Sequence, residues 1–145
     1  MERKIVHVVG TGTIGEPLIG ILCEQKSNLG IDEVTFHKQS PLTKDAPKIK
    51  NLIAKGARLA VHEDRVESFK EIGLEPEFTM EEAVSRSSVV IDCTPKGFGH
   101  QNKADFYEKY ADKVKGFLAQ GSENGFGKKY ARGINDHVIN SEDQF

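Results

Sequence analysis

Cysteine is scarce in this chain, and its scarcity excludes two kinds of stabilised fold. The sequence has two cysteines, Cys23 and Cys93, which form no Cys-x-x-Cys pair, and its five histidines are scattered. A disulfide framework needs several paired cysteines, and a structural zinc site needs clustered Cys or His ligands. We therefore expect reduced thiols and no metal site.

Long hydrophobic runs are also absent. The longest apolar stretches, such as Ile5-Val6 and Val8-Val9 around His7, are short and interrupted. A membrane-spanning helix takes about 20 apolar residues, and a signal peptide also needs a continuous apolar core. The sequence therefore predicts a cytoplasmic protein with no membrane partner.

An excess of positive charge is the third feature that the sequence lacks. Its 20 lysines and arginines are offset by 22 acidic residues. Nucleic-acid-binding domains are usually strongly basic, so we expect no nucleic acid partner. The 145 residues, of which 37% are hydrophobic, suffice for one globular domain with a proper core.

Short β-branched runs alternate with amphipathic stretches along the chain. These runs predict strands at residues 4–9, 33–37, 57–62, 88–92 and 115–119. Strands that are joined by helical crossovers run parallel to one another. The sequence therefore predicts an α/β fold of the Rossmann type, a doubly wound, mostly parallel sheet with helices on both faces.

Helix ends are also predicted by local motifs. Two segments match the capping box, in which the first and fourth residues bond each other's backbone N–H groups: Asp64-Arg65-Val66-Glu67 and Thr79-Met80-Glu81-Glu82. Gly73 is a candidate left-handed end for the first of these helices. A further helix is predicted over residues 101–111.

The first predicted strand runs directly into a glycine-rich turn, Gly10-Thr11-Gly12-Thr13-Ile14-Gly15, and a helical pattern follows it. In a G-x-G-x-x-G turn the glycines permit a tight bend, close approach of a pyrophosphate, and close packing of helix on sheet. The helix N-terminus then points free N–H groups and the positive end of its dipole at the phosphates. In this strand and helix context the turn predicts dinucleotide binding. The alternative is a glycine turn that only packs the helix on the strand.

The end of the second strand indicates which dinucleotide binds. An Asp or Glu there would bond the ribose of NAD and repel the extra phosphate of NADP. The strand instead ends in His37-Lys38-Gln39-Ser40, without a carboxylate. We expect Lys38 and Ser40 to contact the 2′-phosphate, so that NADP is accepted as well as NAD. The alternative is that Lys38 is an ordinary exposed lysine.

The segments that follow the fourth and fifth predicted strands should form the walls of the cofactor crevice, because ligands of such sheets bind beyond the carboxyl ends of the strands. The expected wall residues are Thr94, Pro95, Gly97, Gln120 and Gly121.

Cys93 raises the possibility of a catalytic thiolate, which would need an activating base. No spacing rule supplies that base, and free cysteines are usually buried. We expect a buried residue at the strand end, and no catalytic residue in this chain.

Four segments together resemble the archaeal-type glyceraldehyde-3-phosphate dehydrogenases. They are Gly10-Thr11-Gly12-Thr13-Ile14-Gly15, Lys38-Gln39-Ser40-Pro41, Asp92-Cys93-Thr94-Pro95-Lys96-Gly97 and Gln120-Gly121-Ser122-Glu123. The resemblance covers most of the chain in order and ends near Gly125. The chain departs from the family at Cys93, where Thr is usual, and at Ser122, where Gly is usual.

The resemblance implies an enzyme that oxidises the aldehyde of a phosphorylated triose with NAD or NADP. In that family a cysteine attacks the aldehyde, hydride passes to the nicotinamide, phosphate releases the thioester as an acyl phosphate, and a histidine serves as base. The nucleophile lies in a Ser-Cys-Asn-Thr stretch just beyond the point that corresponds to Phe145. The family residues that carry over here are those of the glycine turn, Lys38, Thr94, Pro95 and Gly97, all toward the cofactor.

From this resemblance we expect residues 1–127 to be an NAD(P)-binding domain. The polar, irregular residues 128–145 would be a tail that leads toward an absent catalytic domain, so that the chain binds cofactor without turnover. Two other functions stay open: a free-standing Rossmann module that senses nucleotide or redox state, and the cofactor half of another aldehyde or semialdehyde dehydrogenase. The family is tetrameric, but its main interfaces involve the second domain, so a homo-oligomer is also left open.

Overall fold

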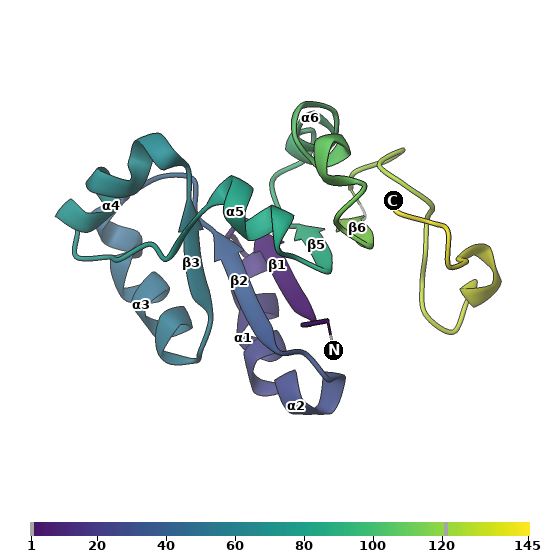
Figure 1. Ribbon diagram of the computed structural model, residues 1–145, viewed down its shortest axis with the longest axis horizontal. Coiled ribbons are helices and arrows are strands. Elements are labelled where there is room, and N and C mark those ends of the chain that lie inside the picture. Colours follow the sequence, from purple (N-terminus) through teal and green to yellow (C-terminus); the bar gives the residue numbers. More distant parts are fainter. Residues whose placement is uncertain (1, 121) are drawn as a thin grey trace.

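One parallel sheet organises the chain. The computed structural model describes residues 2–120 and 122–145, and within them six strands lie in the order β4-β3-β2-β1-β5-β6 (Figure 1). Every neighbouring pair of strands is parallel. The bounds are β1 Ile5–Val9, β2 Glu33–His37, β3 Arg58–Val61, β4 Phe78–Thr79, β5 Val89–Asp92 and β6 Gly116–Ala119. The Rossmann-type α/β fold and all five predicted strands are confirmed. The additional strand, β4, is too short to show a period in the sequence.

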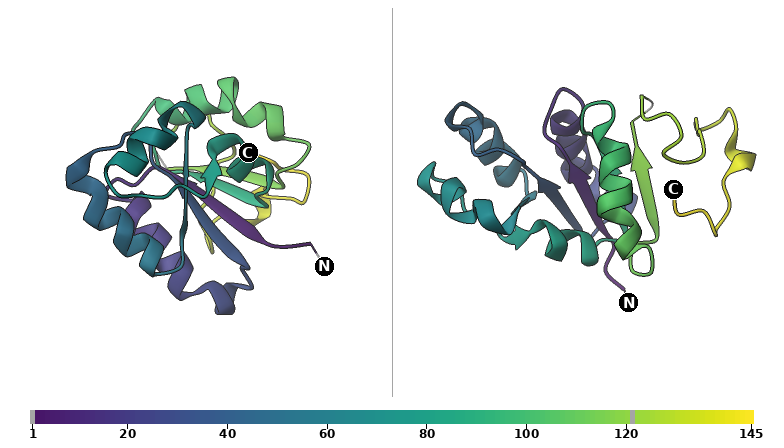
Figure 2. Two further views of the ribbon diagram at one scale, coloured as in Figure 1. Left: turned by 60° about the vertical axis from the view of Figure 1, so that its left-hand side comes forward. Right: turned by 90° about the horizontal axis from the view of Figure 1, so that it is seen from above.

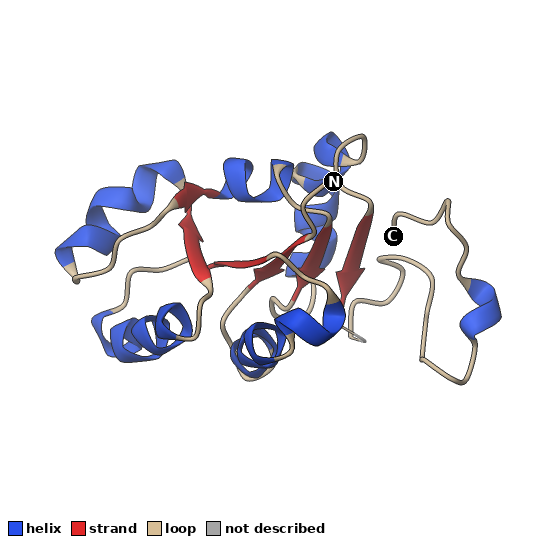
Figure 3. Ribbon diagram, turned by 60° about the horizontal axis from the view of Figure 1, so that its bottom comes forward, coloured by secondary structure: helices blue, strands red, loops and turns tan. Residues whose placement is uncertain are grey.

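Helices cover both faces of this sheet (Figure 3). Their bounds are α1 Gly15–Glu24, α2 Lys26–Leu29, α3 Ala46–Ala54, α4 Val66–Glu71, α5 Met80–Ser85 and α6 Phe98–Asp105. Helices α1 and α3 contribute Ile19 and Ile49, both fully buried, to the larger core cluster. Helix α5 and the 3₁₀ turn after α6 contribute Met80 and Tyr107 to a second cluster, which packs around β5 and β6. Since the two clusters use alternate residues of the same strands, they lie on opposite faces of the sheet.

Only one of the two predicted capping boxes forms. The Thr79 hydroxyl accepts the N–H of Glu82 at 3.2 Å, and the Glu82 carboxylate accepts the N–H of Thr79 at 2.8 Å. The prediction at Asp64 is wrong, because residues 63–65 form a 3₁₀ turn and α4 begins at Val66 with no side-chain cap. The extended residue that precedes this helical segment is His62, so Asp64 is already inside the turn. Gly73 does adopt the expected left-handed conformation, with φ of 78°.

The helix predicted over residues 101–111 is also corrected. Helix α6 begins earlier, at Phe98, because Gly97 turns the chain with a φ of 93°. It ends at Asp105, and a separate 3₁₀ turn, Tyr107–Tyr110, follows after Phe106 leaves the helical conformation.

Residues 128–145 pass around the outer side of β6 (Figure 2). Their one regular element, among the residues described, is a 3₁₀ turn at Asp136–Val138. The segment returns to the sheet, where the Gln144 carbonyl accepts the N–H of Phe117 at 2.6 Å and the Phe145 ring stacks on Phe117 at 4.8 Å. The irregular conformation is as expected, and a domain boundary at residue 127 stays a prediction. In the part of the chain that the structure covers, no helix is long and apolar enough to cross a membrane.

Candidate functional site

The two predicted glycine-containing turns meet at the carboxyl edge of the sheet. From β1 the chain proceeds toward β2 on one side, and from β5 it proceeds toward β6 on the other, so these neighbours form the switch point. A Cβ atom on Gly10 would lie 3.0 Å from the carbonyl oxygen of Cys93 and 3.3 Å from the nitrogen of Thr94. Doubly wound sheets bind their ligands at this point.

The turn after β1 has the geometry that a pyrophosphate requires. Gly10 has a φ of 102°, and a Cβ on Gly15 would overlap the carbonyl oxygen of Gly10, so neither position accepts a side chain easily. Around Gly12, by contrast, no atom of the described residues other than its two chain neighbours lies within 4 Å of the Cβ position. No side chain caps the first turn of α1 within residues 2–120 and 122–145. An open space therefore faces an uncapped helix N-terminus, and this arrangement fits a phosphate group.

The remaining residues of this turn differ in exposure. Thr11 is buried, whereas Thr13 is exposed and the Ile14 side chain is 54% exposed. The carbonyl of Thr11 accepts a hydrogen bond from Lys48 at 2.9 Å, which ties the turn to α3.

Lys38 does not stand alone at the end of β2. Its Nζ lies 2.7 Å from the carboxylate of Asp45, whose other oxygen lies 3.9 Å from Lys48 Nζ. The Lys38 side chain is only 13% exposed, so the alternative of an ordinary exposed lysine is wrong. The hydrogen bond from Lys38 lowers the pKa of Asp45. Ser40 is half-buried, and its carbonyl accepts the N–H of Leu42 at 2.9 Å.

Sequence reasoning missed Asp45 and Lys48. They lie in the turn before α3 and on α3 itself, and only the return of the chain toward β2 brings them to Lys38. No motif marked them, because the fingerprint of dinucleotide sites concerns the strand end alone.

The buried carboxylate of Asp92 fixes the turn after β5 through hydrogen bonds. Asp92 accepts the N–H of Thr94 at 2.9 Å and also its hydroxyl. It further accepts the Asn102 amide at 2.9 Å and the Tyr107 hydroxyl at 2.6 Å. Burial, together with the Asp92 charge, raises the pKa of Tyr107, so this phenol stays a neutral donor. Pro95 and Gly97 are exposed beyond this anchor, and their place in a crevice wall stays a prediction.

Cys93 is a buried residue, as expected, and not an activated thiol. Its sulfur accepts a hydrogen bond from the Gln120 amide at 3.2 Å, and burial raises its pKa. Gln120 continues the ladder past β6 by donating its N–H to the Asp92 carbonyl at 3.3 Å. Gly121, the other residue predicted for this wall, lies outside the described residues.

A second residue that sequence reasoning missed is Glu123. Its buried carboxylate accepts the backbone N–H groups of Gly97 and His100 at the start of α6. The Gln-Gly-Ser-Glu segment belongs to the resemblance described above, but no local sequence pattern indicates that its glutamate contacts α6.

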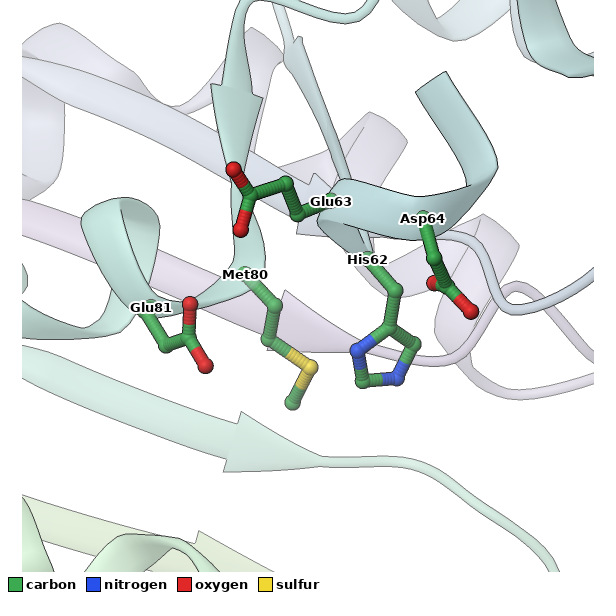
Figure 4. Close-up of a pocket in the computed structure, with 5 residues that line it drawn as sticks. All are labelled: His62, Glu63, Asp64, Met80 and Glu81. Carbon is green, nitrogen blue, oxygen red and sulfur yellow. The ribbon is translucent and has the colours of Figure 1, made fainter. Parts of the chain in front are cut away.

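An acidic hollow lies elsewhere, where β3 ends and β4 passes into α5. It has a volume of about 380 Å³, and the side chains of His62 and Met80 extend into the same space (Figure 4). Its other lining residues are all carboxylates: Glu63, Asp64 and Glu81. These carboxylates are negatively charged and repel phosphate, so this hollow is unsuited to the phosphates of a dinucleotide. The described residues contain no group of three His, Cys, Asp or Glu side chains that could hold a metal ion.

Comparison with known proteins finds relatives along most of the chain. It is 34% identical over 120 residues, 81% of this chain, to a glyceraldehyde-3-phosphate dehydrogenase of Pyrobaculum arsenaticum. It is 33% identical over 121 residues, 83% of this chain, to that of Methanobacterium bryantii, and 44% identical over 73 residues, 47% of this chain, to that of Methanopyrus kandleri. The aligned parts make up 31%, 33% and 20% of these relatives, so the chain spans about a third of their length or less. No family model matches the chain.

Proposed function

We propose that this chain, a homologue of the N-terminal portion of archaeal glyceraldehyde-3-phosphate dehydrogenases, binds NADP or NAD at the switch point between β1 and β5. The observation that carries the proposal is the open, uncapped N-terminus of α1 beside Gly12. Backbone N–H groups and the helix dipole stabilise a pyrophosphate there without a charged side chain.

The other residues act on the parts of the cofactor that lie on either side of the pyrophosphate. Lys38 and Lys48, with Asp45 between them, carry one net positive charge toward the adenosine ribose. The nicotinamide half lies against the wall after β5 and the end of β6. The proposed contact residues are Gly10, Thr11, Gly12, Thr13, Ile14, Gly15, Lys38, Ser40, Thr94, Pro95, Gly97, Gln120 and Gly121. When bound, the dinucleotide supplies a hydride acceptor, and these residues hold and orient it.

We further propose that the chain serves an oxidoreductase that acts on an aldehyde, as the names of its relatives state for them. Residues 1–145 by themselves are proposed to bind cofactor without turnover. Burial raises the pKa of both Cys23 and Cys93, and a thiol in this state is a poor nucleophile at neutral pH.

The binding proposal is tested by replacing Gly12 with Asp. The backbone of Gly12 is not left-handed and its surroundings are open, so Gly12→Asp should fold normally while it repels the phosphates. We expect NADPH affinity, measured by calorimetry, to fall by at least about tenfold, which corresponds to about 1.4 kcal/mol.

The matched control is Gly116→Asp at the start of β6, where the Cβ position is equally open. This variant should bind as the parent chain does. The proposal fails if the parent chain binds neither NADPH nor NADH at millimolar concentration, or if Gly12→Asp binds as tightly as the control.

A further inference from the structure

Glu123 lies in the loop after β6, and its carboxylate is buried against another helix. The side chain is only 1% exposed. Its two oxygens accept the N–H of Gly97, the N-cap residue of α6, and, at 3.2 Å, the N–H of His100 in the first turn of this helix. A buried carboxylate needs such partners, because burying an unpaired charge is costly.

The fit between this side chain and α6 is close. A Cβ on Gly99 would lie 2.9 Å from Glu123 Cγ and 3.1 Å from its carboxyl carbon. The His100 ring adds a second link to the same loop, since its Nε2 lies 2.7 Å from the carbonyl oxygen of Asn124. The loop after β6 and the start of α6 are therefore joined at several points.

The two turns at the switch point differ as a result. The N-terminus of α1 is uncapped and faces open space, whereas the N-terminus of α6 already holds a carboxylate from the protein itself. A negative side chain in that position uses the free N–H groups and compensates the positive end of the dipole. Of these two helix N-termini, only that of α1 therefore leaves its backbone N–H groups available to a cofactor phosphate.

Glu123 also completes the support of the wall after β5. Asp92 holds this segment at Thr94, and Glu123 holds it at Gly97. The exposed residues between these two anchors, Pro95 and Lys96, have their backbone fixed at both ends.

We infer that Glu123 is a positioning residue of the dinucleotide site, which fixes the nicotinamide-side wall and closes the N-terminus of α6 to phosphate. The inference rests on the proposed function. It assigns to Glu123 an effect on the nicotinamide half of the ligand and none on the adenosine half, which lies toward Lys38.

The test compares two ligands, NADPH and 2′,5′-ADP, which has the adenosine half alone. Their affinities are measured by calorimetry for the parent chain, Glu123→Ala, Glu123→Gln and a control, Glu108→Ala, at an exposed position. Loss of two hydrogen bonds from a charged acceptor should weaken NADPH binding about tenfold in Glu123→Ala and leave 2′,5′-ADP binding within about twofold. Gln retains one acceptor oxygen, so Glu123→Gln should lose about half of the binding free energy that Glu123→Ala loses. NADPH binding should therefore weaken about threefold, and 2′,5′-ADP binding should not change.

The ratio of the two affinities decides the outcome. A ratio that stays at the parent value in Glu123→Ala overturns the inference, whether neither ligand or both are weakened, because a general loss of stability would affect both alike. If Glu123→Ala does not fold, the ratio in Glu123→Gln decides in the same way. A parent chain that binds neither ligand contradicts the proposed function itself, and this result is distinct from an unchanged ratio.

Discussion

At the adenosine end of the proposed site, one carboxylate is shared by two lysines. Asp45 lies 2.7 Å from Lys38 and 3.9 Å from Lys48, and Lys48 also reaches the carbonyl of Thr11. A 2′-phosphate must compete with Asp45 for Lys38, while NAD has no such group. The strand end thus favours NADP less strongly than an unpaired lysine would.

Replacing Asp45 with Asn should increase the preference for NADP. The substitution releases Lys38 and Lys48 from the charge of Asp45, while Lys48 keeps its bond to Thr11, and Asp45 makes no capping hydrogen bond to α3 that would be lost. We expect NADP to bind about three- to tenfold more tightly and NAD to be unchanged, with a gain that shrinks at high salt. Dissociation constants for both dinucleotides check this, with Asp112→Asn, at an exposed site, as the control. An unchanged ratio of the two constants would show that Lys38 does not face the 2′ position.

At the scale of the elements, two segments that match the same capping pattern have different outcomes. Thr79 adopts an extended conformation and caps α5, whereas Asp64 lies inside a 3₁₀ turn and caps nothing. The sequence pattern indicates only which side chains could cap a helix. The conformation of the preceding residue decides whether they do.

Thr79→Ala and Asp64→Ala therefore form a matched pair for stability. Loss of an N-cap costs about 1 kcal/mol, so Thr79→Ala should lower the free energy of unfolding by that amount. Asp64→Ala should change it by less than about 0.5 kcal/mol. Urea unfolding followed by circular dichroism measures both, and equal losses would contradict the capping geometry.

At the scale of the whole molecule, the two faces of the sheet differ in polarity. The face under α1 and α3 is apolar, whereas the other face buries His7 and His37. His7 bonds Thr35 at 2.7 Å through Nδ1, and the buried Nε2 atoms of both histidines have no hydrogen-bond partner among the residues that the structure describes. Burial lowers the pKa of each to about 3, so both are neutral in the folded protein at neutral pH.

At the opposite, amino edge of the sheet, a buried carboxylate is surrounded by three partly exposed arginines. Glu33 on β2 contacts Arg3, Arg58 and Arg86 at 2.9 to 3.0 Å. Arg58 begins β3, Arg3 lies shortly before β1, and Arg86 follows α5 shortly before β5. Burial opposes the ionised form, but the hydrogen bond and charge of Arg86 and the charges of the other arginines lower the pKa of Glu33 overall. The cluster ties neighbouring strands together at the edge away from the proposed site.

Mild acid should destabilise the protein through the two buried histidines. An unfolded imidazole takes up a proton near pH 6.5, whereas the folded ones do so only near pH 3. Their contribution is therefore complete above about pH 6.5 and is lost as the pH falls, by about 2 kcal/mol per histidine at pH 5.

His7→Asn keeps a polar group near Thr35 and removes one of these titrations. Between pH 6 and 4.5, the slope of unfolding free energy against pH should decrease by the amount that corresponds to the uptake of about one proton on unfolding. His137→Asn, at an exposed position, should leave the slope unchanged. If His7→Asn has the slope of the parent chain, His7 is not buried as a neutral imidazole.

Local patterns were sufficient for five of the six strands described and for the glycine turn. Alternation and β-branched runs predict strands because successive side chains of a strand point to opposite faces of the sheet, so that the pattern repeats every two residues. Gly15 is equally local, since a Cβ there would overlap the Gly10 carbonyl of the same turn, whereas Gly10 also lies against Cys93 of a distant segment. The predictions at Asp64 and over residues 101–111 were wrong for the opposite reason, because the turns before them set where the helices begin and end.

The sequence by itself determined a parallel α/β sheet with a glycine-rich turn at the end of its first strand, because both are encoded in residues close together along the chain. Only the tertiary structure decided the surroundings of that turn. Asp45 reaches Lys38 and Glu123 reaches Gly97 by contacts between segments far apart in sequence. Such pairs depend on how crossovers bring the carboxyl ends of the strands to one edge, and no local pattern records which side chains will meet there.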